Sequence, residues 1–373
     1  MDFAFSEEQQ LLRATTESFL AAETPITYAR DFSEQDVALL DEALWQRMVA
    51  LGWTGLTVSE ENGGAGLGVL EAVVLAEEMG KVLLPAPWLS TVALAVPVLT
   101  AVGGERADEL LSAIAAGDAR VSLAMLEESG SWNPSDVELV AVTSKEGFVL
   151  EGTKYFVPDA CFATHLLVVA GVDDGLGLFV VETGQAGLAM ETMATVDATR
   201  PLSLVELKDV QLPGSALLGN KTLSASELDG PISSAVCVLA AEMCGVASKA
   251  LDLTLDYLGV REQFGKRLGS FQALQHRCTD MKVSLENARS LVYYAAWAVD
   301  EGRDDSALAV AMAKAWCSDG CSEIVAAAIQ LHGGIGFTWE HDLQLLFRRV
   351  KGSEACWGDA TVQREKVASL LQL

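Results

Sequence analysis

The sequence predicts an α+β fold that is mostly α, with an N-terminal helical domain, a central antiparallel β domain and a C-terminal four-helix bundle. Residues 1–118 carry apolar side chains at helical spacing, residues 119–222 change to short β-rich runs between turn residues, and residues 223–373 return to long helical periodicity. A chain of 373 residues exceeds the usual size of a single hydrophobic core, so a division into these three domains is expected.

Composition argues against a disordered chain and against a nucleic-acid-binding function. Half of the residues are hydrophobic and 21% are charged, which is typical of a globular protein with a large core. The net charge of -27 argues against a nucleic-acid partner, because phosphate-backbone binding needs a basic surface. An anionic cofactor stays possible, since backbone N–H groups and a few arginines can bind phosphates locally.

Neither a signal peptide nor a membrane span is expected. The first eight residues, MDFAFSEE, have no basic start and no apolar stretch, and the longest apolar run, 83–102, contains three prolines. The seven cysteines are scattered, without CxxC pairing or metal-ligand spacing. We therefore expect reduced thiols, no metal and a cytoplasmic location.

The N-terminal domain reads as helices separated by glycine-rich turns. Ser6 and Gln9 form a capping box before a first helix. A second helix is predicted over 37–51, followed by the glycine-rich loop 60–67, and a third over 69–79, which Gly80 would end as its C′ residue.

The central domain reads as hairpins. A largely buried strand at 137–142 is predicted to pair with 148–150 across Lys145-Glu-Gly147. Residues 166–170 are predicted to pair with 178–181 across Asp173-Asp-Gly175, and 202–207 supplies another strand.

Helical spacing resumes after Gly230-Pro231. Apolar residues at intervals of three and four run through 236–251, and long periodic runs follow at 271–300 and 306–331, with a shorter one at the end of the chain. Four helices after one β domain predict a bundle.

Two stretches of this last domain could bind a phosphorylated ligand. The first, 261–272, reads REQFGKRLGSFQ and places three basic side chains beside a glycine turn. The second, 330–338, reads QLHGGIGFT and has three glycines in four positions after a long helix. Taken singly, an ordinary basic loop and a tight helix connection explain them equally well. His332 is expected to be a hydrogen-bonded structural histidine.

Together the two stretches resemble the acyl-CoA dehydrogenase family, which carries Arg-x-Gln-Phe-Gly, then Phe-Gln, then Gln-x-x-Gly-Gly-x-Gly-Phe. LGWTGL at 51–56, ENGGAG at 61–66 and GTK at 152–154 extend the resemblance over nearly the whole chain. The resemblance implies FAD as cofactor, an acyl-CoA substrate, a homotetramer with FAD at subunit interfaces, and electron-transfer flavoprotein as acceptor. It also implies the residues that reach a neighbouring subunit's FAD, namely Arg261, Gln263, Phe264 and Gln272, with Gln330, Gly333, Gly334 and Gly336 in the loop.

The catalytic base of the family is missing. Alignment through Gln363-Arg364 puts Trp357 at the position of the usual glutamate, and an indole cannot accept the α-proton. The position used by a minority of members, 26 residues before the motif arginine, holds Ala235. Three carboxylates lie near enough in sequence to serve as displaced bases, and burial should raise the pKa of whichever one serves: Glu242, Glu354 and Asp359.

The flavin-facing strands also depart from the family. LEESGSWNP at 126–134 replaces a Thr-Glu-Pro-x-x-Gly-Ser-Asp-like segment, and FVPD at 156–159 replaces Trp-Ile-Thr-Asn, so that Pro158 removes an N–H donor. Motifs that serve a neighbour's FAD are kept while those of the chain's own site are eroded.

This asymmetry resembles the non-catalytic, β-type subunit of actinobacterial α2β2 acyl-CoA dehydrogenases, including those of steroid side-chain β-oxidation. The resemblance implies a chain that completes the FAD site of a catalytic α subunit. Two alternatives stay open: a self-sufficient homotetramer with a displaced base, and a catalytically dead binding or assembly homologue.

Overall fold

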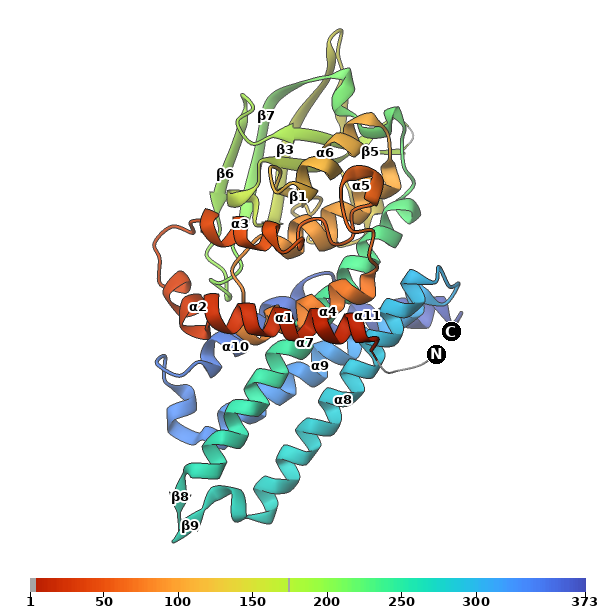
Figure 1. Cartoon of the computed structure of the whole chain (residues 1–373). Coiled ribbons are helices and arrows are strands. Elements are labelled where there is room, and N and C mark those ends of the chain that lie inside the picture. Colours follow the sequence, from red (N-terminus) through yellow and green to blue (C-terminus); the bar gives the residue numbers. More distant parts are fainter. Residues whose placement is uncertain (1–4, 174) are drawn as a thin grey trace.

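A computed structural model describes residues 5–173 and 175–373. Figure 1 shows the β strands at one end of the molecule, the first helices across its middle, and the long helices of the C-terminal half extending to the other end. The predicted order of helices, strands and helices is confirmed, and so is the fold class.

Besides the short 3₁₀ turn η1 (Glu60–Asn62), the described N-terminal part contains six α-helices and one π-helical segment: α1 (Glu7–Glu23), α2 (Ile26–Ser33), α3 (Glu42–Ala50), α4 (Val69–Val82), the π-helical η2 (Leu89–Ala95), α5 (Val96–Val102) and α6 (Glu105–Ala115). The predicted capping box of Ser6 and Gln9 is confirmed at the start of α1. The second predicted helix begins five residues late, at Glu42, because the Asp41 side chain accepts a hydrogen bond from the Leu44 N–H and caps the helix there.

The prediction that Gly80 ends the third helix is wrong. Helix α4 continues to Val82 and ends at Leu83, which adopts a left-handed conformation with φ 56°. Gly80 is needed for packing instead, since a Cβ at this position would lie 2.2 Å from the carbonyl oxygen of Glu242 in the neighbouring helix α7 (Ala225–Val260). Gly245 of α7 makes the reciprocal approach, with its Cβ position 1.9 Å from the Glu77 carbonyl oxygen. The two backbones therefore cross in direct contact.

Seven strands form two sheets between the helical parts. One sheet has the order β1-β4-β5 and the other β2-β3-β7-β6, with bounds β1 (Val121–Ala124), β2 (Ala141–Thr143), β3 (Gly147–Pro158), β4 (His165–Val172), β5 (Gly175–Glu182), β6 (Leu188–Thr192) and β7 (Leu202–Pro213). All pairings are antiparallel except that of β1 with β4. The predicted strands at 148–150, 166–170, 178–181 and 202–207 are confirmed, and 166–170 pairs with 178–181 as predicted; the turn residue Asp174 lies outside the described residues.

The predicted buried strand at 137–142 is wrong in two respects. Only residues 141–143 are strand, and Val140 and Val142 are 59% and 61% exposed. The run lies at a sheet edge, where it pairs with β3 and makes an isolated bridge from Val140 to Gly171. Leu139 and Ala141 are buried while Val140 and Val142 are exposed, so only one face of the run is covered, although both faces are apolar.

The C-terminal part consists of α7, α8 (Gln272–Asp300), α9 (Ser306–His332), α10 (Leu343–Ala355) and α11 (Ala360–Leu370). A two-stranded hairpin, β8 (Glu262–Gln263) and β9 (Lys266–Arg267), joins α7 to α8 at the far end of the molecule (Figure 1). Among the described residues, α7 is the one helix long and apolar enough to cross a membrane, and 89% of its most apolar window is buried in the protein.

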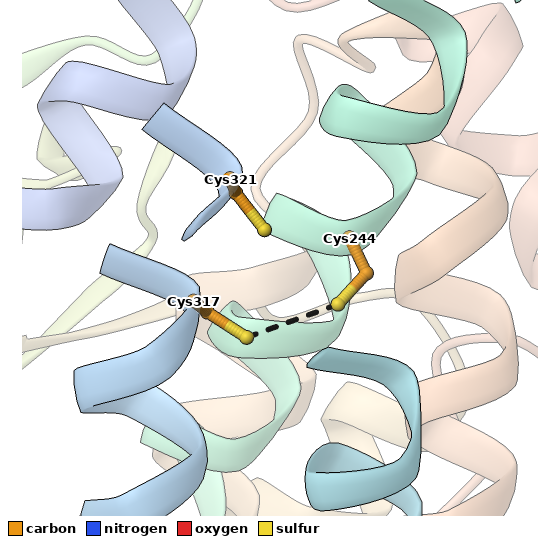
Figure 2. Close-up of side chains that lie close together, drawn as sticks. All are labelled: Cys244, Cys317 and Cys321. Carbon is orange, nitrogen blue, oxygen red and sulfur yellow. Dashed lines mark hydrogen bonds between the residues drawn. The ribbon is translucent and has the colours of Figure 1, made fainter. Parts of the chain in front are cut away.

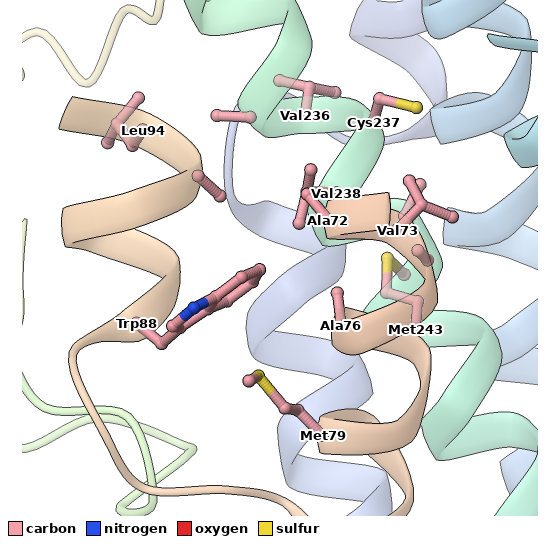
Figure 3. Close-up of a cluster of buried hydrophobic side chains, with 14 of the residues drawn as sticks. Ala72, Val73, Ala76, Met79, Trp88, Leu94, Val236, Cys237, Val238 and Met243 are labelled. Carbon is pink, nitrogen blue, oxygen red and sulfur yellow. The ribbon is translucent and has the colours of Figure 1, made fainter. Parts of the chain in front are cut away.

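The main core lies where α4, α7 and the η2 segment meet. Figure 3 shows Trp88 and Leu94 on one side and the side chains of α4 and α7 on the other. Trp88 is 2% exposed and donates its indole N–H to the Trp53 carbonyl oxygen at 2.9 Å. This core joins the N-terminal helices to the C-terminal bundle as one packed body.

Candidate functional site

The two sequence motifs lie at neighbouring helix ends. Arg261 caps the C-terminus of α7, and the glycine loop, η8 (Gly333–Phe337), follows α9 directly. Tyr257, one turn before Arg261, stacks on His332 with ring centroids 4.4 Å apart. His332 is buried, and its Nδ1 lies 2.8 Å from the Ala328 carbonyl oxygen, so the expected structural role is supported.

The first motif forms an exposed hairpin tip. Phe264 and Gly265 both have positive φ angles, 56° and 79°, which is the pattern of a two-residue turn of type I′. An aromatic residue is disfavoured in that conformation, yet Phe264 occupies it and is 89% exposed. Arg261, Gln263 and Gln272 are exposed beside it. A strained and exposed aromatic side chain indicates contact with something outside this chain.

The glycine loop points to the same conclusion. Gly336 is required within the chain, because a Cβ there would lie 2.6 Å from the Ile329 carbonyl oxygen, and Gly333 has a φ of 64°. Gly334 has neither constraint: its φ is not positive, and nothing lies within 4 Å of its Cβ position. Gln330, Gly333 and Gly334 are exposed, while Ile335 and Phe337 are 50% and 75% exposed. No described residue of this chain explains Gly334, whose backbone is open to the approach of an external group.

Trp357, predicted to occupy the position of the usual base, lies in an aromatic contact. Its indole packs against that of Trp132, with centroids 4.7 Å apart. The two rings border a cleft of about 560 Å³ between the 130–135 segment, α7, α9 and α11. Trp357 itself has a φ of 61°, and its carbonyl oxygen accepts a hydrogen bond from the Gln363 side chain at 2.6 Å.

A buried lysine fixes the loop around Trp357. Lys314 of α9 is fully buried and donates to the carbonyl oxygens of Glu354 and Gly358, each at 3.0 Å, and to the Ser318 hydroxyl. Burial lowers the pKa of Lys314 to about 8. The loop around Trp357 is therefore held by hydrogen bonds from both Lys314 and Gln363.

Each candidate for a displaced base is engaged elsewhere. Asp359 caps α11 by accepting the N–H groups of Thr361 and Val362. Glu354 accepts hydrogen bonds from Ser322 and Lys351. Ala235, the alternative position, is buried in α7 and has no titratable group. Asp359 therefore serves as a helix cap, and Glu354 as an ion-pair partner.

Glu242 belongs to a buried ionic network. Its Oε1 lies 2.6 Å from Arg349 Nη1, its other oxygen contacts Arg200, and Arg349 Nε lies 2.7 Å from Asp197 Oδ2. Burial acts to raise the pKa of Glu242, but the two arginines outweigh burial and hold this pKa below its ordinary value. The expectation that burial raises the pKa of a displaced base is therefore wrong for Glu242, which is held as an ionised partner of arginine.

The network leaves no room for a substrate. The cavity beside Glu242, lined by Trp88, Asp159, Arg200 and Arg349 among others, has a volume of about 20 Å³. That volume holds about one water molecule, whereas small-molecule pockets measure roughly 300–1,000 Å³.

The eroded strands have their own internal partners. Glu127 accepts hydrogen bonds from Lys154 Nζ and from the N–H groups of Glu138 and Leu139. Asp159, left-handed at φ 52°, accepts a hydrogen bond from Ser90 Oγ at 2.7 Å, and burial raises its pKa to about 6. Sequence reasoning missed the roles of Arg200, Lys314 and Arg349. In the sequence, a single arginine or lysine gives no sign of being buried and paired until its partners are known.

Comparisons with known proteins agree across the chain. Residues 6–118 match the family model "Acyl-CoA dehydrogenase, N-terminal domain" and residues 236–371 match "Acyl-CoA dehydrogenase, C-terminal domain". Acyl-CoA dehydrogenase IpdE2 of Mycolicibacterium smegmatis is 31% identical over 97% of this chain and 98% of its own length.

Solved structures superpose over almost all of the chain. A chain of the Tcur3481–Tcur3483 steroid acyl-CoA dehydrogenase is 30% identical, with a TM-score of 0.86 and 98% of each chain covered. A chain of the ChsE4–ChsE5 complex of Mycobacterium tuberculosis is 26% identical, with a TM-score of 0.90, 100% of this chain and 99% of that chain covered. The FAD complex of PigA is 26% identical, with a TM-score of 0.90 and both chains fully covered.

Proposed function

This chain belongs to the acyl-CoA dehydrogenase family, and we propose that it is a non-catalytic subunit which completes the FAD site of a catalytic partner in a heterotetramer. The observation that carries the proposal is the contrast between the two ends of the molecule. The residues that meet a neighbour's cofactor are exposed at the hairpin tip and the glycine loop, while every position for a base is apolar or engaged.

The exposed residues fit FAD chemically. Arg261 offers a guanidinium fork to the diphosphate, and Gly334 lets the backbone approach without a Cβ in the way. Gln263 and Gln272 add amide donors, and Phe264 offers an aromatic face to a base or to partner side chains. FAD, when bound, supplies the hydride acceptor for oxidation of an acyl-CoA thioester.

A heteromeric assembly is supported by two of the neighbours. The Tcur3481–Tcur3483 and ChsE4–ChsE5 structures are named for pairs of subunits, and the first is a steroid acyl-CoA dehydrogenase. The substrate of the assembly is accordingly an acyl-CoA thioester of fatty-acid or steroid side-chain β-oxidation, and electron-transfer flavoprotein is its acceptor.

The decisive experiment compares the chain alone with the chain co-expressed with a partner subunit. The partner is an acyl-CoA dehydrogenase that keeps its glutamate or aspartate base, and the neighbouring reading frame is the first place to look for it. We expect the chain alone to carry little FAD and to oxidise no acyl-CoA, and the pair to bind FAD and turn over. Stoichiometric FAD with thioester oxidation by the chain alone would overturn the proposal in favour of a self-sufficient homotetramer. A preparation that stays free of FAD with every such partner would overturn it in favour of a binding or assembly protein.

Site variants make the same experiment residue-specific. Arg261→Ala in the co-expressed pair should lower FAD retention because it removes the diphosphate fork. Lys282→Ala is the matched control: Lys282 is an exposed cation on α8 whose partner is Glu286 at 2.7 Å. Equal FAD retention in both variants would contradict the assignment of Arg261.

A further inference from the structure

Three thiols converge where α7 crosses α9. Cys244 comes from α7, while Cys317 and Cys321 lie one turn apart on α9, and Figure 2 shows all three sulfurs directed into the space between the helices. The sulfur atoms all lie within 4.8 Å of one another, and those of Cys244 and Cys317 are 3.8 Å apart. The three residues are at most 1% exposed.

This spacing matches a trigonal thiolate site. A metal–sulfur bond of about 2.3 Å in a planar three-coordinate site places the sulfurs about 4 Å apart. The distance between Cys244 Sγ and Cys317 Sγ is close to that value, and it is nearly twice the roughly 2.05 Å of a disulfide bond. The helical i,i+4 spacing of Cys317 and Cys321 sets the second edge of the triangle.

The identity of the ion follows from the ligand set. Soft thiolates select Cu(I), Zn²⁺ and iron–sulfur clusters, and Zn²⁺ requires four ligands. Within 5–173 and 175–373, no further histidine, cysteine or carboxylate joins the three sulfurs. The buried carboxylate of Glu77 is held by Arg13, Arg289 and Tyr293. Three thiolates without a fourth ligand suit Cu(I).

Nearby cations offset the charge that such a site would carry. Cu(I) bound by three thiolates displaces three protons and leaves a net charge of -2 in the core. Lys314 lies one turn before Cys317 on α9, is fully buried, and donates its hydrogen bonds to neutral oxygens only. Arg289 of the neighbouring helix α8, which pairs with Glu77 and Glu286, is a second positive group.

We propose that Cys244, Cys317 and Cys321 bind one Cu(I) ion as a buried trigonal site that ties α7 to α9. These two helices end at the hairpin tip and at the glycine loop, so the ion would brace the pair of helices that carry both motifs. No electron is transferred in this step: three S–H bonds are lost, three Cu–S bonds form, and three protons are released. Binding to the folded chain alone stabilises it by mass action.

The test uses the full-length chain with Cys161→Ser and Cys356→Ser, which removes the two thiols that are not buried. Because the site is buried, the chain is loaded in two ways: in copper-supplemented cultures, and by prolonged anaerobic incubation with Cu(I) against a chromophoric Cu(I) chelator. We expect one chelator-resistant Cu(I) per chain and an X-ray absorption spectrum with three sulfur neighbours at about 2.3 Å. This spectrum is read on the chain with its three site cysteines intact and needs no site variant to fold.

Variants then assign the ligands. Cys317→Ser and Cys321→Ser should each weaken Cu(I) retention by more than about 100-fold, beyond the loss typical of outer partners. The matched control is Cys237→Ser, also buried in α7, whose thiol instead contacts the Val292 carbonyl oxygen at 3.6 Å. Absence of bound copper after both loadings, a coordination shell without three sulfurs, or equal retention in the site and control variants would each overturn the proposal. Oxidation of Cys244 and Cys317 to a disulfide in place of metal binding would overturn it too.

Discussion

The indole of Trp357 packs against that of Trp132, with ring centroids 4.7 Å apart and planes inclined at 42°. The contact joins the loop after α10 to the segment before β2, so the residue predicted to replace the catalytic glutamate also has a packing role. Restoring the family's residue should therefore not restore its chemistry. We expect Trp357→Glu to leave the isolated chain without acyl-CoA oxidation and to lower its stability by about 1–3 kcal/mol, through lost burial and the lost aromatic pair.

Acyl-CoA oxidation assays and denaturant unfolding check this prediction. Trp357→Phe keeps an aromatic ring and serves as the control, with a smaller loss of stability expected. Measurable turnover by the glutamate variant alone would show that the rest of the site is intact, contrary to the proposed function.

Removing the Glu242 carboxylate should lower the free energy of unfolding, because Glu242 has a structural role and not a catalytic one. Glu242→Gln leaves Arg200 and Arg349 without their shared anion in the core, and breaking a buried pair in this way costs about 3–5 kcal/mol. Glu354→Gln is the comparison, because Glu354 pairs with the half-buried Lys351 and such pairs contribute roughly 0–1 kcal/mol. Urea unfolding of both variants measures the difference. Equal stabilities would contradict the assigned network.

Asp159 should make stability depend on pH between about 4 and 6. Burial raises its folded pKa to about 6 from an ordinary 3.8, so the folded chain holds this proton more tightly than the unfolded chain does. The stabilisation that comes from this tighter proton binding is complete below the unfolded-state pKa. It is lost as pH rises through the folded-state pKa. Asp159→Asn should remove that fall and be more stable than the parent at pH 7.5 by roughly 2–3 kcal/mol.

Unfolding at pH 4.5 and pH 7.5 tests the sign. The exposed Asp252→Asn on α7 is the control and should follow the parent at both values. A fall in stability from pH 4.5 to pH 7.5 that is as large in Asp159→Asn as in the parent chain would show that Asp159 is not the source.

Phe264→Asn should change stability and cofactor binding in opposite directions. Asparagine tolerates the left-handed conformation that Phe264 adopts at φ 56°, and Asn-Gly is the favoured pair in a type I′ turn. We expect the isolated chain to gain up to about 1 kcal/mol, and FAD retention by the assembled pair to fall. Thermal unfolding of the chain and flavin counting on the pair give the two readings; a loss of stability together with unchanged flavin would contradict the assigned role.

The sequence allowed the order of helices and strands and the exposed motifs to be predicted because they depend on local signals. The Ser6 capping box and the glycines of the 333–336 loop need only their neighbours in the chain. The two domain boundaries, at 118/119 and 222/223, stay predictions, with β1 beginning at Val121 and α7 at Ala225.

What could not be predicted depends on partners distant in sequence. Glu242 is a plausible base until Arg200 and Arg349, 42 and 107 residues away, are placed beside it. The three cysteines showed no metal-ligand spacing, because Cys244 lies 73 residues from Cys317 and only the helix crossing unites them. Gly80 was read as a helix terminator, although its role is fixed by the α7 backbone.

The contact between α4 and α7 has a consequence for how this sequence can diverge. Gly80 touches the backbone of Glu242 and Gly245 touches that of Glu77, so each glycine lies against a residue whose side chain anchors a separate buried ionic network. A methyl group at either glycine would push the helices apart and misalign both sets of charges at once. A substitution of Gly80 or Gly245 alone should therefore not be tolerated. Related chains that differ at these positions should also differ at Glu77, Glu242 or their arginine partners.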